Sequence, residues 1–183
     1  MVSLDGYFEA PNHDLSWHVV DEEFNDFASE QMRESDTILF GRRTYQLMES
    51  FWPSKEGLED DPVVANLMNE TPKIVVSKSL KNVVETEEWK NVRLINESVE
   101  EEIRKLKKEK GGDIMLLGSS NLCVSLLEWG LLDEMRLMIN PVVIGKGTQL
   151  FHGLKNKVDL QLTKSRNFAS GNVLLTYTPE VEN

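Results

Sequence analysis

The sequence predicts an α/β protein in which helices flank a mixed, mostly parallel sheet that includes a C-terminal antiparallel hairpin. Short apolar runs alternate along the chain with stretches whose apolar residues recur at helical spacing. Several runs are apolar without interruption, as in strands that are buried on both faces of a parallel sheet. Beyond Gly130 apolar and polar residues alternate instead, which is typical of antiparallel strands with one solvated face.

The first third of the chain predicts two strands and two helices. Residues 2–4 indicate a strand before the turn Asp5-Gly6, and we expect its beginning to lie before Met1 or to be missing. Asp21 is a suitable N-cap for a helix that ends near Ser35. A buried strand and a second helix follow, at 37–40 and 42–49.

The remaining elements follow from the same patterns. The Pro, Gly and acidic residues of 52–61 predict an exposed loop, and Ser98 is expected to cap a helix that Gly111-Gly112 stops. Alternation predicts a strand over 132–139 and a final hairpin. The other expected elements are a short helix at 62–68, strands at 74–76, 92–95 and 114–117, a helix carrying Leu122, Leu126 and Trp129, and hairpin strands at 158–168 and 173–177.

Composition limits the possible functions. With 183 residues, of which 40% are hydrophobic, the chain is long enough for one well-packed domain, and we expect a single domain over 1–183. The formal charge of -11 would repel a phosphate backbone, so nucleic acid is not an expected partner. The absence of a leader or a long apolar span predicts a soluble, cytoplasmic protein without a membrane partner.

Polar groups suited to phosphate follow three of the expected strands. Glycine permits tight turns and close approach of a ligand, while helix N-termini and guanidinium groups attract anions. Ligands of open α/β sheets bind beyond the carboxyl ends of the strands, so these groups together predict a dinucleotide site. Alone, each also fits an ordinary turn, a solvated charge or an N-cap. The three groups are Gly41-Arg42-Arg43-Thr44, Ser77-Lys78 and Gly118-Ser119-Ser120-Asn121.

Other motifs fail on spacing. A phosphate-binding P-loop requires Ser or Thr directly after its Lys, but Gly147 follows Lys146, and no stretch fits G-x-G-x-x-G. The three His residues have no ligand spacing with Cys123 or with one another, so no metal site is expected. Cys123 lies among leucines and is interpreted as a small core residue.

Several segments, in order along nearly the whole chain, resemble one family. They are Ser3-Leu4-Asp5-Gly6, Ser16-Trp17, Phe40-Gly41-Arg42-Arg43-Thr44-Tyr45, Gly118 with its helix, Gly130-Leu131-Leu132-Asp133-Glu134 and Pro141-Val142-Val143-Ile144-Gly145. The chain is similar to the reductase domain that forms the C-terminal part of the bifunctional riboflavin-biosynthesis deaminase-reductase. That domain has the dihydrofolate-reductase-like fold, and the resemblance is closest to its stand-alone members. The zinc-binding deaminase half has no counterpart in this sequence.

The resemblance implies an NADPH-dependent oxidoreductase, similar to 5-amino-6-(5-phosphoribosylamino)uracil reductase. It places Arg42, Arg43 and Thr44 at the cofactor phosphates and Ser77 with Lys78 at the adenosine ribose. The helix N-terminus at 118–121 would then face the pyrophosphate. A 2′-phosphate needs a cation, which Lys78 or Arg43 supplies, so NADPH is expected in preference to NADH. The general acid, if there is one, is not identified.

The resemblance also indicates substrate-binding residues for a small heterocycle or ribosyl-pyrimidine. These are Asp5, Trp17, Asp26 and Trp52. Asp26, next to Asn25, falls near the carboxylate that binds the pterin ring in dihydrofolate reductase. Tryptophans at such positions are more often core aromatics, and Asp26 also fits a solvated helix charge.

Two alternatives remain open at this point: a binding protein of the same fold without turnover, and a dihydrofolate or pterin reductase. We also expect a homodimer, because the strand 132–139 and the hairpin 158–177 place apolar side chains near a sheet edge.

Overall fold

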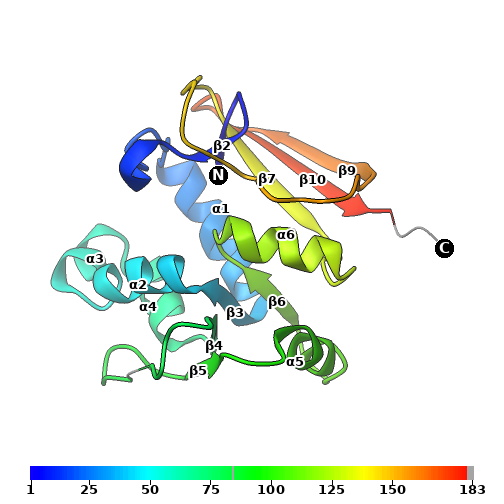
Figure 1. Cartoon of the computed structure of the whole chain (residues 1–183). Coiled ribbons are helices and arrows are strands. Elements are labelled where there is room, and N and C mark those ends of the chain that lie inside the picture. The colour runs from blue at the N-terminus through cyan, green and yellow to red at the C-terminus, as the bar shows by residue number, and fades with distance from the viewer. Residues whose placement is uncertain (84, 181–183) are drawn as a thin grey trace. The chain divides into compact units, whose positions relative to one another are not determined.

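The computed structural model describes residues 1–83 and 85–180, which form an α/β fold with a parallel sheet, helices and an antiparallel C-terminal hairpin (Figure 1). The predicted fold class is therefore confirmed. Contacts divide the chain into two compact units. Unit 1 contains residues 1–24 and those described from 123 onward, and unit 2 contains residues 25–122. The boundaries fall within the helices α1 (Glu22–Arg33) and α6 (Ser120–Glu128). A single domain over 1–183 stays a prediction.

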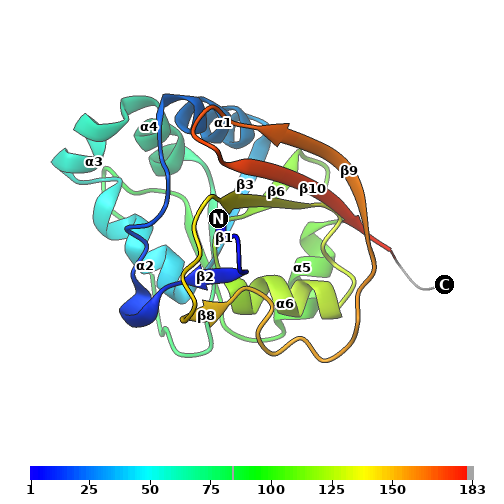
Figure 2. The same cartoon turned by 90° about the horizontal axis from the view of Figure 1, so that it is seen from above.

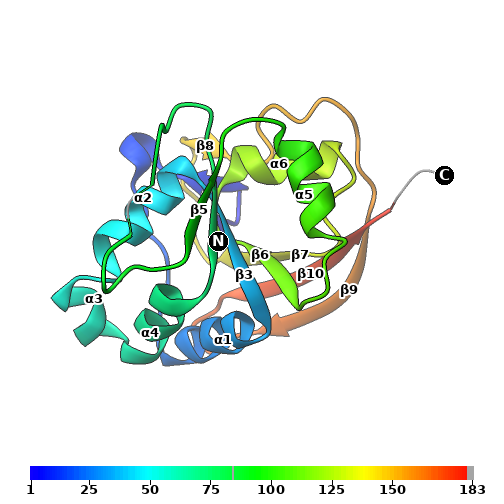
Figure 3. The same cartoon turned by 90° about the horizontal axis from the view of Figure 1, so that it is seen from below.

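The sheet of unit 2 is entirely parallel, with the strand order β5-β4-β3-β6. Figure 3 shows β3 and β6 side by side. The strands are β3 (Ser35–Gly41), β4 (Lys73–Val76), β5 (Val92–Ile95) and β6 (Asp113–Leu116). All four expected strands are confirmed. Successive buried residues in the central strands β3 and β4 reflect burial on both faces, whereas Arg93 in β5 is exposed.

All the expected helices are present, together with one helix that was not expected. They are α1 (Glu22–Arg33), α2 (Arg42–Phe51), α3 (Lys55–Asp60), α4 (Pro62–Glu70), α5 (Val99–Leu106) and α6 (Ser120–Glu128). Asp21 caps α1 as predicted, because its carboxylate accepts the N–H of Phe24 at 2.9 Å.

The loop expected over 52–61 is wrong, because this stretch contains the helix α3. Ser54 caps it by accepting the N–H of Gly57 at 3.1 Å. Asp61 then caps α4 by accepting the N–H groups of Val63 and Val64. Two consecutive caps thus offset the weak helix preference of the Gly-containing, acidic stretch.

The helix that begins after Ser98 is shorter than expected. It ends at Leu106, before Gly111-Gly112, and Ser98 makes no side-chain capping bond. The Gly112 N–H instead donates to the carboxylate of Asp36, near the start of β3. The glycine pair therefore serves the turn into β6 rather than the helix end.

The core of unit 2 packs β3 and β4 against helices and one loop. It contains the buried residues Met32, Ile38, Phe40, Tyr45, Val64, Met68, Val75 and Trp89. Trp89 precedes β5 and is only 1% exposed. Such a residue holds a long connection against the sheet because it removes a large apolar surface from water.

Unit 1 contains a four-stranded sheet with the order β1-β7-β10-β9. Figure 2 shows β7, β10 and β9 running side by side. Its elements are β1 (Val2–Ser3), β7 (Met135–Asn140), β9 (Leu160–Asn167) and β10 (Val173–Pro179), with the short pair β2 (Tyr7–Glu9) and β8 (Thr148–Gln149) and the 3₁₀ turn η1 (Pro11–His13). The predicted hairpin is confirmed as β9 and β10.

The expected homodimer stays a prediction, and the strand order shows where the sheet of unit 1 has its edges. The strand expected near a sheet edge, residues 132–139, corresponds to β7, which pairs with β1 on one side and β10 on the other. Among the described strands, β9 pairs only with β10 and ends this sheet. On the other side of the sheet, β1 pairs with β7 only at Ile139 and Asn140, so among the described strands both β9 and the first part of β7 offer an open edge.

Candidate functional site

The carboxyl ends of β4, β3 and β6 lie next to one another in unit 2. Gly41, the last residue of β3, is in register with Val76 of β4, and Leu39 is in register with Leu116 of β6. Three polar segments follow these ends, namely Ser77-Lys78, Arg42-Arg43-Thr44 and Gly118-Ser119-Ser120-Asn121. The parallel register therefore brings the predicted phosphate-binding segments to one edge of the sheet.

A direct hydrogen bond joins two of these strand ends. The N–H of Gly41 donates to Ser119 Oγ at 2.7 Å, and Ser119 Oγ donates to Thr44 Oγ1 at 3.0 Å. A side chain on Gly118, whose φ is +56°, would meet Thr44 Oγ1 at 3.0 Å. The absence of a side chain at Gly118 is thus what allows the two segments to approach so closely.

The first turn of α2 suits an anion. Gly41 precedes the helix, no side chain caps its N-terminus, and no acidic residue lies in its first turn. Arg42 and Arg43 are exposed there, although positive charge is unfavourable at the positive end of the helix dipole. Backbone N–H groups without a side-chain cap and two guanidinium groups at one helix start favour the binding of an anion.

The segment after β4 contributes a cation on a fixed turn. Ser77 is buried, and its Oγ accepts the N–H groups of Ser79 and Leu80 at 3.2 and 3.1 Å. Ser77 therefore shapes the turn, while Lys78 next to it is exposed. Within the described part of the chain, Arg42 and Lys78 make no ion pair, which leaves both charges available to a ligand.

Two of the expected substrate residues belong to unit 1. Asp5 accepts hydrogen bonds from the Ser3 hydroxyl and the N–H groups of Ile144 and Gly145, at 2.6, 3.1 and 2.8 Å. The Ser3 hydroxyl and these amides lower the pKa of Asp5. Asp5 is thus an ionised group that holds the loop after β7. Trp17 Nε1 donates to the carbonyl of Asp14 at 3.1 Å.

The other two belong to unit 2. Asp26 is exposed on α1, which also fits a solvated helix charge. Trp52 is partly buried against the unit 2 core, and its Nε1 donates to Met48 Sδ at 3.1 Å. Its surroundings match the core-aromatic interpretation. Substrate roles for Asp5, Trp17, Asp26 and Trp52 stay predictions.

A pair of buried amides in unit 1 was not expected from the sequence. Asn140 Oδ1 accepts the N–H of Val19 at 2.8 Å, and Asn172 Nδ2 donates to the Val19 carbonyl at 2.9 Å. Both asparagines are fully buried. They fix the segment that carries Trp17, but more than a hundred residues separate each from Val19, so no local pattern indicates the contact.

Metal and thiol chemistry find no support among the described residues. No group of three or more His, Cys, Asp or Glu side chains there could hold a metal ion. Cys123 is buried, and burial raises the pKa of its thiol to about 11, as expected for a core residue. Burial lowers the pKa of His18 to about 4, so its imidazole is neutral at pH 7.

The sequence matches the family model of the RibD C-terminal domain over residues 1–174. The chain belongs to this family. The Bacillus subtilis (strain 168) protein YyaP, which is described as uncharacterized, is 34% identical over 178 residues, covering 96% of this chain and 90% of YyaP.

Solved structures of the same fold include a putative riboflavin biosynthesis protein from Shewanella sp. PV-4. Its TM-score is 0.73 at 23% identity, covering 98% of this chain and 96% of that one. The deaminase and 5-amino-6-(5-phosphoribosylamino)uracil reductase of Thermotoga maritima has a TM-score of 0.68 at 19% identity. The match covers 97% of this chain and 54% of that one. Dihydrofolate reductase from Enterococcus faecalis, complexed with NADP(H), has a TM-score of 0.61 at 16% identity. The match covers 98% of this chain and 93% of that one. The fold is thus the dihydrofolate-reductase-like one of the riboflavin-pathway reductases.

Among the residues that the structure describes, no helix is both long and apolar enough to cross a membrane.

Proposed function

We propose that this RibD C-terminal domain protein is an NADPH-dependent reductase of a small heterocycle or ribosyl-pyrimidine. The observation that carries the proposal is the convergence of three strand ends with an uncapped, arginine-rich helix start. The reductase fold of the family supports an oxidoreductase, and the NADP(H) in the E. faecalis structure supports a nicotinamide cofactor. In this protein, the polar residues that follow β3, β4 and β6 would form one continuous anion-binding edge of the unit 2 sheet.

The residues fit the cofactor as follows. The N–H groups at the start of α2 and the Thr44 hydroxyl would hold phosphate oxygens, together with the helix start at Ser120-Asn121. Gly41 and Gly118 allow the close approach of that ligand. Arg42, Arg43 and Lys78 supply the positive charge that a 2′-phosphate requires. When bound, the reduced nicotinamide supplies a hydride to the acceptor.

The protein's contribution to such a reaction is orientation. Hydride transfer between a cofactor and an acceptor depends mainly on holding the two reactants in place, and solvent water can supply the proton that the reduced C=O or C=N group takes up. For the heterocycle, the resemblance offers Trp17 and the carboxylate of Asp5 in unit 1 and, separately, Trp52 and the carboxylate of Asp26 in unit 2. The deaminase and reductase activities named for the T. maritima protein suggest a ribosylaminopyrimidine as the first substrate to test.

Two alternatives fit the same cofactor edge. A binding protein of this fold would bind NADPH without turning it over, and a pterin reductase would oxidise NADPH with pterins or dihydrofolate only. NADPH oxidation, followed at the nicotinamide absorbance over ribosylaminopyrimidines, pterins and dihydrofolate, separates the three. Turnover of a ribosylaminopyrimidine is the result that we expect.

The preference for NADPH over NADH tests the role of the basic residues at the start of α2 and after β4. We expect tighter binding of NADPH than of NADH, because each charge-assisted contact to the 2′-phosphate contributes about 1.5–3 kcal/mol. The substitutions Arg43→Ala and Lys78→Ala should each weaken NADPH binding roughly ten- to a hundredfold and NADH binding much less. Added salt should narrow the gap between the cofactors. Nicotinamide fluorescence titration measures all of these affinities.

The matched control is Lys55→Ala. Lys55 lies on α3, its side chain is 88% exposed, and its removal changes the net charge by the same amount. It should leave both affinities unchanged. Equal affinities for NADPH and NADH in every variant would reject the 2′-phosphate assignment.

We also propose that the protein is a homodimer that uses the β9 edge. β9 has one partner strand, and Leu162 on it is 52% exposed. An open edge with an exposed aliphatic side chain is stabilised by covering it with a second copy. Light scattering at micromolar concentration should give the dimer mass, and Leu162→Lys should shift it toward the monomer. A monomer mass for the unmodified protein contradicts the proposal.

A further inference from the structure

Polar groups from two different strand ends meet at the Ser119 hydroxyl. Ser119 Oγ accepts the N–H of Gly41 at 2.7 Å, and its one hydroxyl hydrogen can be donated either to Thr44 Oγ1 at 3.0 Å or to the Leu117 carbonyl at 3.1 Å. Gly41 ends β3 and Thr44 lies in the first turn of α2, whereas Ser119 follows β6. One side chain therefore fixes the start of α2 against the segment that precedes α6.

The backbone at Ser119 is strained. Its φ is +58°, directly after Gly118 at +56°, so two successive residues adopt the left-handed conformation. A residue with a Cβ occupies that region at a cost of roughly 1–2 kcal/mol. Glycine at 119 would avoid this cost but would also lose the hydroxyl. The Ser119 hydroxyl, which a glycine at this position would lack, thus accompanies the backbone strain.

The order of donors and acceptors gives Thr44 a defined role. Ser119 has a single hydroxyl hydrogen, and when it donates this to Thr44 Oγ1, the hydroxyl hydrogen of Thr44 remains. In that arrangement the described residues provide no other acceptor for this hydrogen. In the alternative one, Thr44 donates to Ser119 Oγ while Ser119 donates to the Leu117 carbonyl, and a bound phosphate oxygen would favour the first arrangement. A hydroxyl that already accepts a hydrogen bond is a stronger donor. The chain from Gly41 through Ser119 therefore ends in a polarised donor at the arginine-rich helix start.

We propose that Ser119 is a positioning residue for phosphate binding. It orients and polarises the Thr44 hydroxyl, which donates to a phosphate oxygen of the cofactor, while Ser119 itself need not touch the ligand. The inference rests on the proposed function, because the ligand is the NADPH assigned there. Ser119 thus acts through Thr44 and thereby influences the affinity for NADPH.

The test compares Ser119→Ala with the matched control Ser50→Ala. Ser50 lies on the exposed side of α2, where its hydroxyl donates to the Leu47 carbonyl at 2.9 Å. By fluorescence titration with NADPH, Ser119→Ala should raise Kd about tenfold at unchanged stoichiometry, and Ser50→Ala should leave Kd unchanged. Ser119→Gly, which relieves the strain, should bind as weakly as Ser119→Ala.

Two further variants separate positioning from a structural role. Thr44→Val should weaken binding at least as much as Ser119→Ala, and the double variant should be no weaker than Thr44→Val alone, because both changes remove one donor. Additive losses overturn the inference. A lower binding stoichiometry at unchanged Kd also overturns it, since that result indicates loss of folded protein only.

The outcomes also distinguish this inference from the proposed function. If the unmodified protein binds NADPH and Ser119→Ala binds it as well as Ser50→Ala does, the positioning role is wrong and the proposed function stands. If the unmodified protein binds neither NADPH nor NADH, both are wrong.

Discussion

At the scale of single residues, Gly118 shows how a missing side chain shapes the proposed cofactor edge. Its φ is +56°, and an added Cβ would lie 3.0 Å from Thr44 Oγ1 and 3.1 Å from Thr44 Cγ2. Gly118→Ala should lower the free energy of unfolding by about 2–4 kcal/mol, because left-handed strain and overpacking add. It should also weaken NADPH binding by displacing Thr44. Urea denaturation and fluorescence titration measure the two effects.

Gly130 provides the control for that substitution. Its φ is +63°, and an added Cβ would have no heavy atom within 4 Å. Gly130→Ala therefore tests backbone strain alone and should cost only about 1–2 kcal/mol, with no change in NADPH affinity. Equal effects of the two substitutions on stability would show that contact with Thr44 is unimportant.

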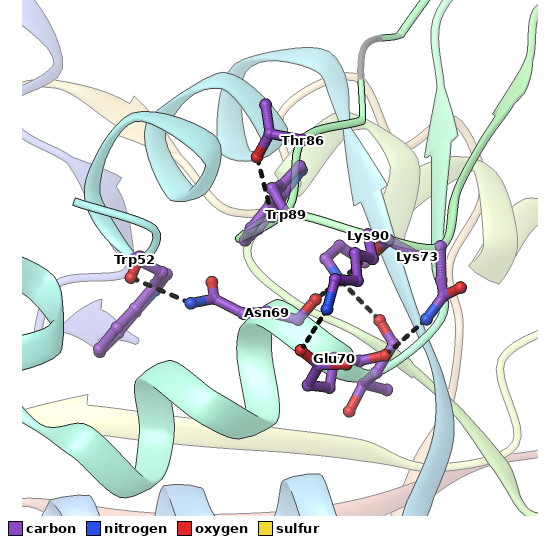
Figure 4. Close-up of polar contacts among 9 residues, drawn as sticks. Trp52, Asn69, Glu70, Lys73, Thr86, Trp89 and Lys90 are labelled. Atoms are coloured by element: carbon purple, nitrogen blue, oxygen red, sulfur yellow. Dashed lines mark hydrogen bonds and ion pairs between the residues drawn. The ribbon is translucent and has the colours of Figure 1, made fainter.

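At the scale of elements, Lys73 joins the end of α4 to the segment before β5. It is 1% exposed, and its Nζ donates to the carbonyls of Asn69, Thr71 and Lys90 at 2.8, 2.7 and 2.9 Å (Figure 4). The same ammonium lies 4.6 Å from the centroid of the Trp89 ring. Lys73→Met should destabilise the protein by about 2–4 kcal/mol at pH 7, since buried carbonyls lose their donor. Urea denaturation measures the loss.

The loss of stability in Lys73→Met depends on pH, because the pKa of Lys73 differs between the folded and unfolded states. Burial lowers the pKa of Lys73 from 10.5 to about 8. Between these values the unfolded state binds more protons than the folded state, so the free energy of unfolding rises with pH. The stability gap between the unmodified protein and Lys73→Met should therefore widen from pH 8 to 10.5, by up to about 3 kcal/mol. A gap that narrows over this range would contradict the assignment.

Elements whose signal is local were predictable from the sequence. The apolar runs at 74–76 and 92–95 became β4 and β5, and the alternation beyond Gly130 became antiparallel strands. The helix α3 was missed because its stability depends on the caps at Ser54 and Asp61, which composition does not reveal. The proximity of the polar strand ends followed from the parallel order, but the Ser119 bond did not, because it joins residues 78 positions apart.

At the scale of the whole molecule, the two compact units raise the question of cooperativity. Helices α1 and α6 each continue from one unit into the other, so unfolding of either unit would remove part of a helix from its neighbour. Because an interrupted helix loses its terminal hydrogen bonds and its packed face, we expect both units to unfold in one transition. Amide hydrogen exchange along a urea series, read on peptides from β3 in unit 2 and β10 in unit 1, should give a single midpoint. Two midpoints would indicate independent domains and would overturn the single domain expected over 1–183.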